Sequence, residues 1–176
     1  HEECKTCLLF VDAVTSYSWV VFVDSENASQ FLDALDYVRT DLRSGRNLKV
    51  VFYDNHSMVF KKHNYFNETS EEVTEWKSKN KNVDFKLTTE SQQNLAETYI
   101  GILRQRESKM RANFRLGPKF QMASIRYANV ITRLLPNERI GGRAPIQEAV
   151  QRNPAKYLKR VRVFGCDAYI NPRSGN

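Results

Sequence analysis

Two kinds of hydrophobic pattern alternate along this chain, and their order limits the folds it can adopt. Apolar, β-branched and aromatic runs at Leu8–Val11 and Tyr17–Val23 flank a polar Thr15-Ser16 pair, which predicts a β-hairpin. Compact apolar runs at Leu48–Tyr53 and Val83–Leu87 predict two further strands. Helices are predicted from near residue 26 to Gly45, around residues 73–76, at 95–113, at 118–135 and at 144–152, with a final strand at Arg160–Ile170. This order predicts an α/β fold with helices packed on a mixed sheet.

The composition is that of one globular domain. The 176 residues suffice for a single core, and 41% of them are hydrophobic. No segment approaches the ~20 apolar residues of a membrane span, so we expect no membrane partner. Three cysteines, Cys4, Cys7 and Cys166, are too few for a disulfide framework and favour a reducing compartment. Cys4 and Cys7 have zinc-knuckle spacing, but no second ligand pair follows at the spacing of a zinc finger.

Charge is distributed unevenly along the chain. Residues 1–97 carry 11 basic and 16 acidic side chains, a net charge of −5, and residues 98–176 carry 16 basic and 4 acidic ones, a net charge of +12. A strongly basic half predicts a polyanionic partner, and a solvated basic surface is the alternative. The candidate nucleic-acid contacts on the predicted helix at 95–113 and just beyond it are Arg104, Arg106, Lys109, Arg111 and Arg115.

Three carboxylates stand at the edges of predicted elements. Asp12 and Asp54 each follow a strand, and Glu97 lies in the first turn of a long predicted helix. Carboxylates gathered at one rim repel each other unless a divalent cation neutralises them, and hard cations such as Mg²⁺ prefer oxygen ligands. Asp in a turn and Glu at a helix N-terminus are also ordinary placements. We expect the carboxylates of Asp54 and Glu97 to lie together on one rim of the sheet.

Several short motifs occur in a fixed order along nearly the whole chain. They are Leu8–Asp12 with Thr15–Val20, Tyr53-Asp54-Asn55, Leu87–Thr89 with Gln92–Asn94 and Ala96-Glu97, Asn129–Pro136 with Gly141–Pro145, and Leu158–Tyr169. This series resembles the integrase catalytic core encoded in the Pol polyprotein of copia-type LTR retrotransposons. The last motif, which contains Val163-Phe164-Gly165-Cys166, is the most specific.

The resemblance implies an RNase H-like fold similar to the retroviral integrase core, with added C-terminal helices. It implies a core at residues 1–135 and a C-terminal extension at 136–176. The implied enzyme is a Mg²⁺-dependent (or Mn²⁺-dependent) polynucleotidyl transferase that joins element DNA ends to target DNA, with Asp54 and Glu97 as catalytic metal ligands. Homo-oligomers located in the nucleus or in a virus-like particle are implied as well.

The family uses three carboxylates, and the first stands on a strand that precedes the hairpin. Because Val11-Asp12 matches the end of the family's second strand, we expect the first catalytic Asp upstream of His1. A weaker alternative is an RNase H-like nuclease that uses Asp12 as its first carboxylate.

The chain also departs from the family pattern around the predicted site. His56-Ser57 replaces a Gly pair, Met58 replaces a Glu, Thr98 replaces an Arg, and Ile100-Gly101 replaces an Asn-Arg pair. Two functions therefore stay open. One is an integrase core that binds DNA and transfers strands, incomplete or inactive as this chain. The other is a domesticated module that binds nucleic acid or protein without catalysis.

Overall fold

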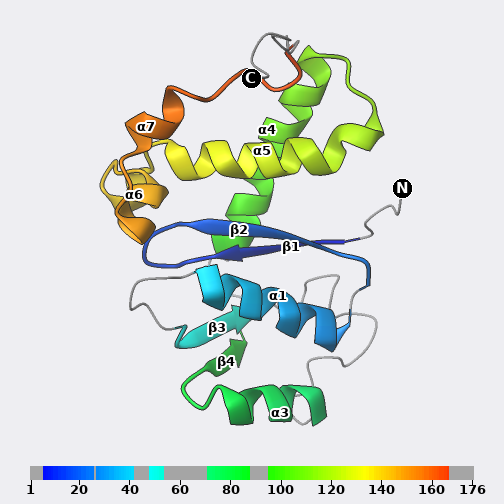
Figure 1. The fold of residues 1–176 in the computed structure, drawn as a ribbon, viewed down its shortest axis with the longest axis vertical. Helices are drawn as coiled ribbons and strands as arrows, with labels where there is room; N and C mark the ends of the chain where they lie inside the picture. The colour runs from blue at the N-terminus through cyan, green and yellow to red at the C-terminus, as the bar shows by residue number, and fades with distance from the viewer. Residues whose placement is uncertain (1–5, 26, 42–47, 54–70, 88–94, 167–176) are drawn as a thin grey trace, which may run out of the picture.

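A β-hairpin lies between two groups of helices and organises the molecule (Figure 1). The computed structural model describes residues 6–25, 27–41, 48–53, 71–87 and 95–166. Strand β1 (Thr6–Val11) pairs antiparallel with β2 (Ser18–Val23), from Thr6↔Val23 to Val11↔Ser18. Helix α1 (Ala28–Asp41) packs on one side of the hairpin, while α4 (Leu95–Asn113) and α5 (Gln121–Leu134) pack on the other. The predicted hairpin and the three long helices are confirmed.

A second, parallel pair of strands lies beyond α1. Strand β3 (Val50–Tyr53) pairs with β4 (Asp84–Leu87), and α3 (Glu71–Lys79) lies on the connection between them. Both strands are confirmed. Within the described residues the four strands form two separate two-stranded sheets, one antiparallel and one parallel, rather than one continuous mixed sheet.

The main hydrophobic core fills the space between the hairpin, α1 and the parallel strands. Its most buried large side chains are Leu35 of α1 and Val73 of α3. Trp76 meets Phe85 of β4 edge-on, with ring centroids 5.7 Å apart. Because these side chains come from α1, α3 and β4, the core fixes the parallel pair against α1.

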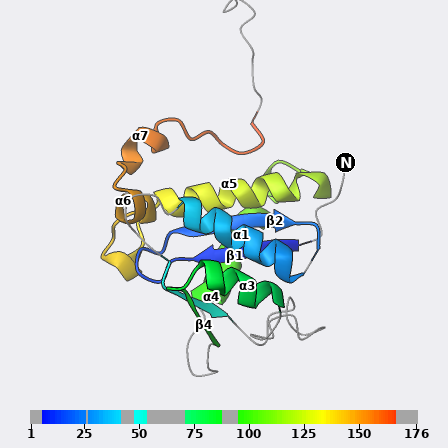
Figure 2. The ribbon, with the colours of Figure 1, turned by 60° about the horizontal axis from the view of Figure 1, so that its bottom comes forward.

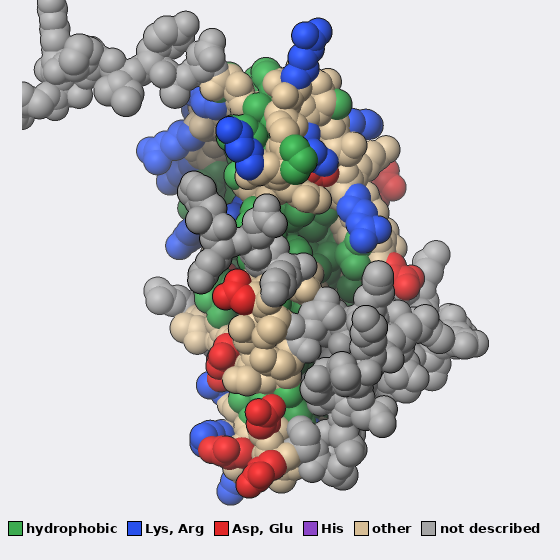
Figure 3. Space-filling view, turned by 90° about the vertical axis from the view of Figure 1, so that its right-hand side faces the viewer, with side chains coloured by type: hydrophobic (Ala, Val, Ile, Leu, Met, Phe, Trp, Pro, Cys, Tyr) green, Lys and Arg blue, Asp and Glu red, His purple; other side chains and the backbone are tan. Residues whose placement is uncertain are grey.

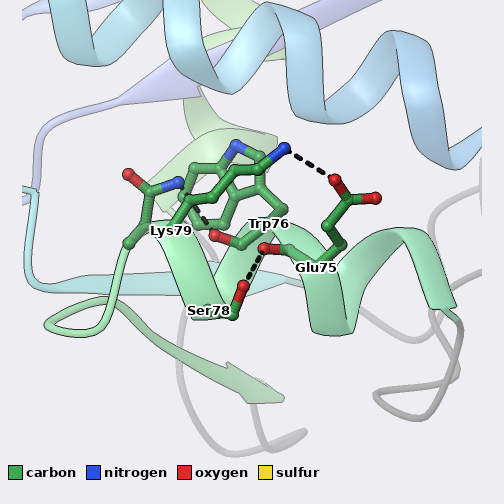
Figure 4. A network of polar contacts seen from close by, with 5 residues as sticks. Glu75, Trp76, Ser78 and Lys79 are labelled. Atoms are coloured by element: carbon green, nitrogen blue, oxygen red, sulfur yellow. Dashed lines mark hydrogen bonds and ion pairs between the residues drawn. The ribbon is translucent and has the colours of Figure 1, made fainter.

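Helix α3 shows how one short helix separates its buried and exposed faces. Trp76 points into the core, while Lys79 reaches back to Glu75 at 2.7 Å on the solvent side (Figure 4). Ser78 donates to the Glu75 carbonyl at 2.7 Å. The hydrogen bond from Lys79 lowers the pKa of Glu75 below its ordinary value, and the charge of Lys79 acts in the same direction.

The C-terminal helices build a second core over the turn end of the hairpin. Helices α6 (Pro145–Val150) and α7 (Pro154–Leu158) follow α5, each with a proline in its first turn. Ile146 of α6 packs in one cluster with Tyr17, Trp19 and Leu134. Helix α6 and the hairpin therefore share a core.

The predicted final strand at Arg160–Ile170 is wrong for residues 160–166, and residues 167–170 lie outside the described part. Residues 160–166 run along the outer side of α5 (Figure 2). Their amides bond to carbonyls three residues back, as in Val161 to Leu158 and Cys166 to Val163. Val161 and Phe164 face α5 while Val163 is 63% exposed, so the alternation does not reflect strand pairing.

The long helices of the described part pack against the rest of the protein through one buried face. Helix α4 has 19 residues, and its buried face includes Tyr99 and Leu103. None of the helices in residues 6–166 that the structure describes has both the length and the apolar character needed to cross a membrane.

Truncating Trp76 tests the role of α3 in the core. We expect Trp76→Ala to lower the free energy of unfolding by about 3–5 kcal/mol, because it removes a buried indole. Lys79→Ala, on the exposed face of the same helix, should leave stability almost unchanged. Urea unfolding followed by circular dichroism measures both. Equal losses in the two variants would contradict this account of the core.

Candidate functional site

The carboxyl ends of β3 and β4 meet at one edge of the parallel pair. The register pairs Tyr53 with Leu87, the last residue of each strand. Asp54 follows Tyr53 directly, but it lies outside the described residues. The chain leaves β4 at the same edge and enters α4 at Leu95. Ligands bind at this kind of edge in open α/β sheets, so the residues that follow Tyr53 and Leu87 start from a typical ligand-binding edge.

Glu97 lies in the first turn of α4, and its side chain is exposed. The partial positive charge of a helix N-terminus favours a carboxylate at this position. Two residues later, the Tyr99 hydroxyl donates to the Ser16 carbonyl at 3.0 Å and accepts from Asn137 Nδ2 at 2.7 Å. Tyr99 is 2% exposed, so this pair of hydrogen bonds fixes the start of α4 against the hairpin turn.

Asp12 serves the hairpin turn. Its Oδ1 accepts from the Val14 amide at 3.0 Å, and its Oδ2 accepts from Thr15 Oγ1 at 2.5 Å. Its main chain also closes the turn, with Ser16 donating to the Asp12 carbonyl at 2.8 Å. Aspartate commonly stabilises turns through such hydrogen bonds to nearby residues. The geometry favours a turn residue over a metal ligand, which weakens the nuclease alternative.

No cluster of three or more potential metal ligands occurs within the residues that the structure describes. Of the predicted ligand pair, only Glu97 belongs to that part, because Asp54 does not. His56 and Cys4 also lie outside the described residues. Of the two cysteines with zinc-knuckle spacing, the structure therefore describes Cys7 of β1 but not Cys4. The oxygen donor of Glu97 suits a hard cation.

The five predicted nucleic-acid contacts divide into two groups. Arg104, Lys109 and Arg115 are exposed. Arg106 instead donates to Thr132 Oγ1 of α5 at 2.5 Å, and burial lowers the pKa of its guanidinium from the ordinary value. Arg111 forms an ion pair with Glu107.

The partner of Arg111 explains why that arginine belongs to the helix interface. Glu107 is 6% exposed and also accepts a hydrogen bond from Ser124 of α5 at 3.3 Å. A buried carboxylate requires a paired cation, and Arg111 supplies it. Helical spacing already indicated the inward position of Arg106, since it lies three residues after Leu103 on the apolar face of α4.

A buried polar network, which sequence analysis did not identify, joins the hairpin to α5. Ser18 Oγ donates to Asn129 Oδ1 at 2.5 Å, and the Ser18 carbonyl accepts from Asn129 Nδ2 at 3.2 Å and from Arg133 Nε at 2.5 Å. Arg133 also stacks on Tyr17, 4.2 Å from the ring centroid. The spacing of Asn129 and Arg133, four residues apart on one helix face, was the available signal.

Solved structures of a retroviral integrase core have the same fold. The HTLV-2 integrase catalytic core domain in complex with magnesium, in its trimeric form, matches with a TM-score of 0.58 and 17% sequence identity, over 81% of this chain and 83% of that chain. The dimeric form matches with a TM-score of 0.57 and 18% identity, over 80% and 81% of the two chains. No protein-family model and no curated protein matches the sequence. The predicted RNase H-like, integrase-core fold is confirmed.

A matched pair of arginine variants tests the division of the basic residues. We expect Arg106→Ala to destabilise the protein by about 1 kcal/mol or more, because it removes a partly buried hydrogen bond and packed methylenes. Arg104→Ala should stay within about 0.5 kcal/mol of the unmodified protein. Thermal unfolding of both variants provides the measurement. An unchanged stability in Arg106→Ala would place that side chain on the surface instead.

Proposed function

We propose that this chain is the catalytic-core region of a copia-type retrotransposon integrase, derived from a Pol polyprotein, that handles DNA with the help of a divalent cation. The observation that carries the proposal is the pairing of Tyr53 with Leu87, in a chain with an integrase-core fold. That pairing brings the attachment point of Asp54 to the edge from which the chain runs into α4 and Glu97. Strand transfer of element DNA ends into target DNA is the reaction that this arrangement supports best.

Asp54 and Glu97 are the residues that would hold Mg²⁺ or Mn²⁺. Carboxylate oxygens are the donors that such cations prefer, and the similar HTLV-2 cores were solved with magnesium. The bound cation stabilises the negative charge that develops on a phosphodiester under in-line attack. Tyr99, through its hydrogen bonds to Ser16 and Asn137, keeps the first turn of α4 and hence Glu97 in a fixed place.

DNA is the proposed partner of the basic half of the chain. Arg104, Lys109 and Arg115 are exposed, so they suit phosphate contacts. Figure 3 shows Lys and Arg side chains mainly over the upper part of one face and Asp and Glu mainly over its lower part. This separation orients a polyanion toward the α4–α5 end of the molecule.

The proposal also includes the oligomeric state of the protein, its location in the cell and the division of the chain into two parts. The similar HTLV-2 cores are described as dimeric and trimeric forms, which supports a homo-oligomer here. Action in the nucleus or within a virus-like particle follows from an integrase role. We further propose that residues 1–135 form the core and residues 136–176 its C-terminal extension.

A non-catalytic nucleic-acid or protein-binding module is the second candidate. The start of α4 favours it, because Ile100 is 38% exposed and Gly101 is exposed where the resembled pattern has Asn-Arg. An isoleucine and a glycine therefore stand where the resembled pattern has polar side chains that would contact DNA beside Glu97. This candidate keeps DNA binding by the basic half but predicts no cation at Glu97.

DNA binding should depend steeply on salt. We expect the affinity for a 30-base-pair duplex, measured by fluorescence anisotropy, to fall linearly on a log–log plot with a slope of about −0.9 per phosphate contacted. The combined variant Arg104→Glu, Lys109→Glu and Arg115→Glu should flatten this slope. Lys79→Glu on α3 is the control and should leave it unchanged. Binding that ignores salt, or no binding, would contradict the DNA assignment.

Strand transfer by this chain alone is not expected, because its sequence supplies two of the three carboxylates that the chemistry uses. A joining assay with labelled element-end DNA and Mg²⁺ or Mn²⁺ should give no product. Product that disappears in Asp54→Asn and persists in Asp84→Asn, a matched change on the exposed side of β4, would show instead that the chain is a complete enzyme.

A further inference from the structure

An apolar groove follows the outer face of α5. A cavity of about 440 Å³ lies between α5, α6 and the segment 157–162, and Val130, Leu134, Ile146 and Val161 supply its aliphatic lining. A second hollow of about 770 Å³ continues along α5 and shares Tyr127 and Val130 with the first. We call the two together the α5 groove. Val130 lies in both parts and is 43% exposed, so the groove is open to solvent along its length.

Basic side chains line this apolar surface and, among the described residues, no carboxylate does, although the charge of Asp41 acts on Arg133 from outside the lining. Arg133, Arg160 and Arg162 line the first part, and Lys119 and Arg126 line the second. Arg133 is recessed, because its Nε is bound to the Ser18 carbonyl and its guanidinium lies over Tyr17. A cation held in an apolar setting attracts an anion more strongly than one in free solvent.

The outer wall of the groove is held in place by specific contacts. Tyr127 donates its hydroxyl hydrogen bond to the Arg162 carbonyl, and its ring meets Phe164 with centroids 5.4 Å apart. Gly165 adopts a φ of +84°, and a Cβ there would lie 2.9 Å from Phe114 Cγ. Only glycine permits this close approach, so the wall is pinned to the end of α4.

We propose that the α5 groove binds an acidic peptide segment of a partner protein, independently of the function proposed above. An aromatic or aliphatic side chain of the peptide seats on the exposed Val130 and Tyr157, and flanking carboxylates meet Arg133, Arg160 and Arg162. The aliphatic lining and the recess of Arg133 favour this occupant over duplex DNA, whose phosphates contact protruding cations such as Arg104. Peptide recognition commonly combines such apolar anchors with arginines that read acidic motifs.

An NMR titration of the ¹⁵N-labelled full chain tests the proposal. The probe is a peptide of sequence Asp-Glu-Asp-Leu-Phe-Asp-Glu-Asp, and its binding should shift the amide signals of Val130, Val161 and Arg162. Val130→Glu and, separately, Arg160→Glu should weaken binding about tenfold or more, because each places a carboxylate beside the peptide's own. Val14→Glu, at a position 79% exposed on the hairpin turn, is the control and should bind unchanged. Circular dichroism confirms that each variant is folded.

Four results would overturn the proposal. The first is equal binding of a peptide in which lysines replace the acidic residues, and the second is a set of shifts away from the α5 groove. The third is tighter occupation of the same residues by a 20-nucleotide single-stranded DNA, which would make the groove a nucleic-acid site. The fourth is the same shifts on raising the protein concentration without peptide, which would assign the groove to a second copy of this chain.

Discussion

The buried hydrogen bonds between the start of β2 and helix α5 are the constraint on which the rest of the structure depends. The Ser18 carbonyl accepts from both Asn129 and Arg133, and Ser18 has 0% exposure. A buried polar group that loses its partner costs about 1–3 kcal/mol. Sliding α5 along the hairpin would break these hydrogen bonds, so they favour a single alignment of α5 against β2. Because α4, α6 and the C-terminal segment all pack on α5, their positions follow from it.

That junction also connects the shared core to the candidate site. Tyr99 fastens the start of α4 to the hairpin turn at Ser16, two residues before the strand that contacts α5. Glu97 is thus positioned from the hairpin, whereas the end of β3 is positioned by the core around α1. The site lies where these two supports meet, and the basic side chains of α4 extend from the same helix. The proposed DNA strand transfer would need carboxylates at this edge and a basic surface beside them.

Local patterns in the sequence were sufficient to predict most of the elements. The bounds predicted for the long helix, Leu95 and Asn113, are those of α4, and the hairpin and both parallel strands are confirmed. The fold type followed from motif order, which carries information that periodicity lacks. The strand predicted at residues 160–166 is wrong because alternation is also compatible with a segment that lies on a helix and bonds only locally.

Features set by contacts between distant residues were beyond local prediction. The roles of Arg106 and Arg111 depend on Thr132, Ser124 and Glu107, and no spacing rule connects α4 to a particular residue of α5. The pairing of Ser18 with Asn129, 111 residues apart, is of the same kind. Charge counts identify a basic half of the chain, but they do not distinguish a cation that faces solvent from one that neutralises a buried carboxylate.

A crystal structure of the full chain grown with MnCl₂ tests the central claim most directly, because the anomalous signal of manganese locates the ion without ambiguity. We predict one Mn²⁺ at the carboxyl edge of β3 and β4, bound by oxygens of both Asp54 and Glu97 at about 2.0–2.2 Å, close to the distances of similar hard cations. Carboxylates of Asp54 and Glu97 on opposite faces of the strands, with no manganese between them, would contradict it.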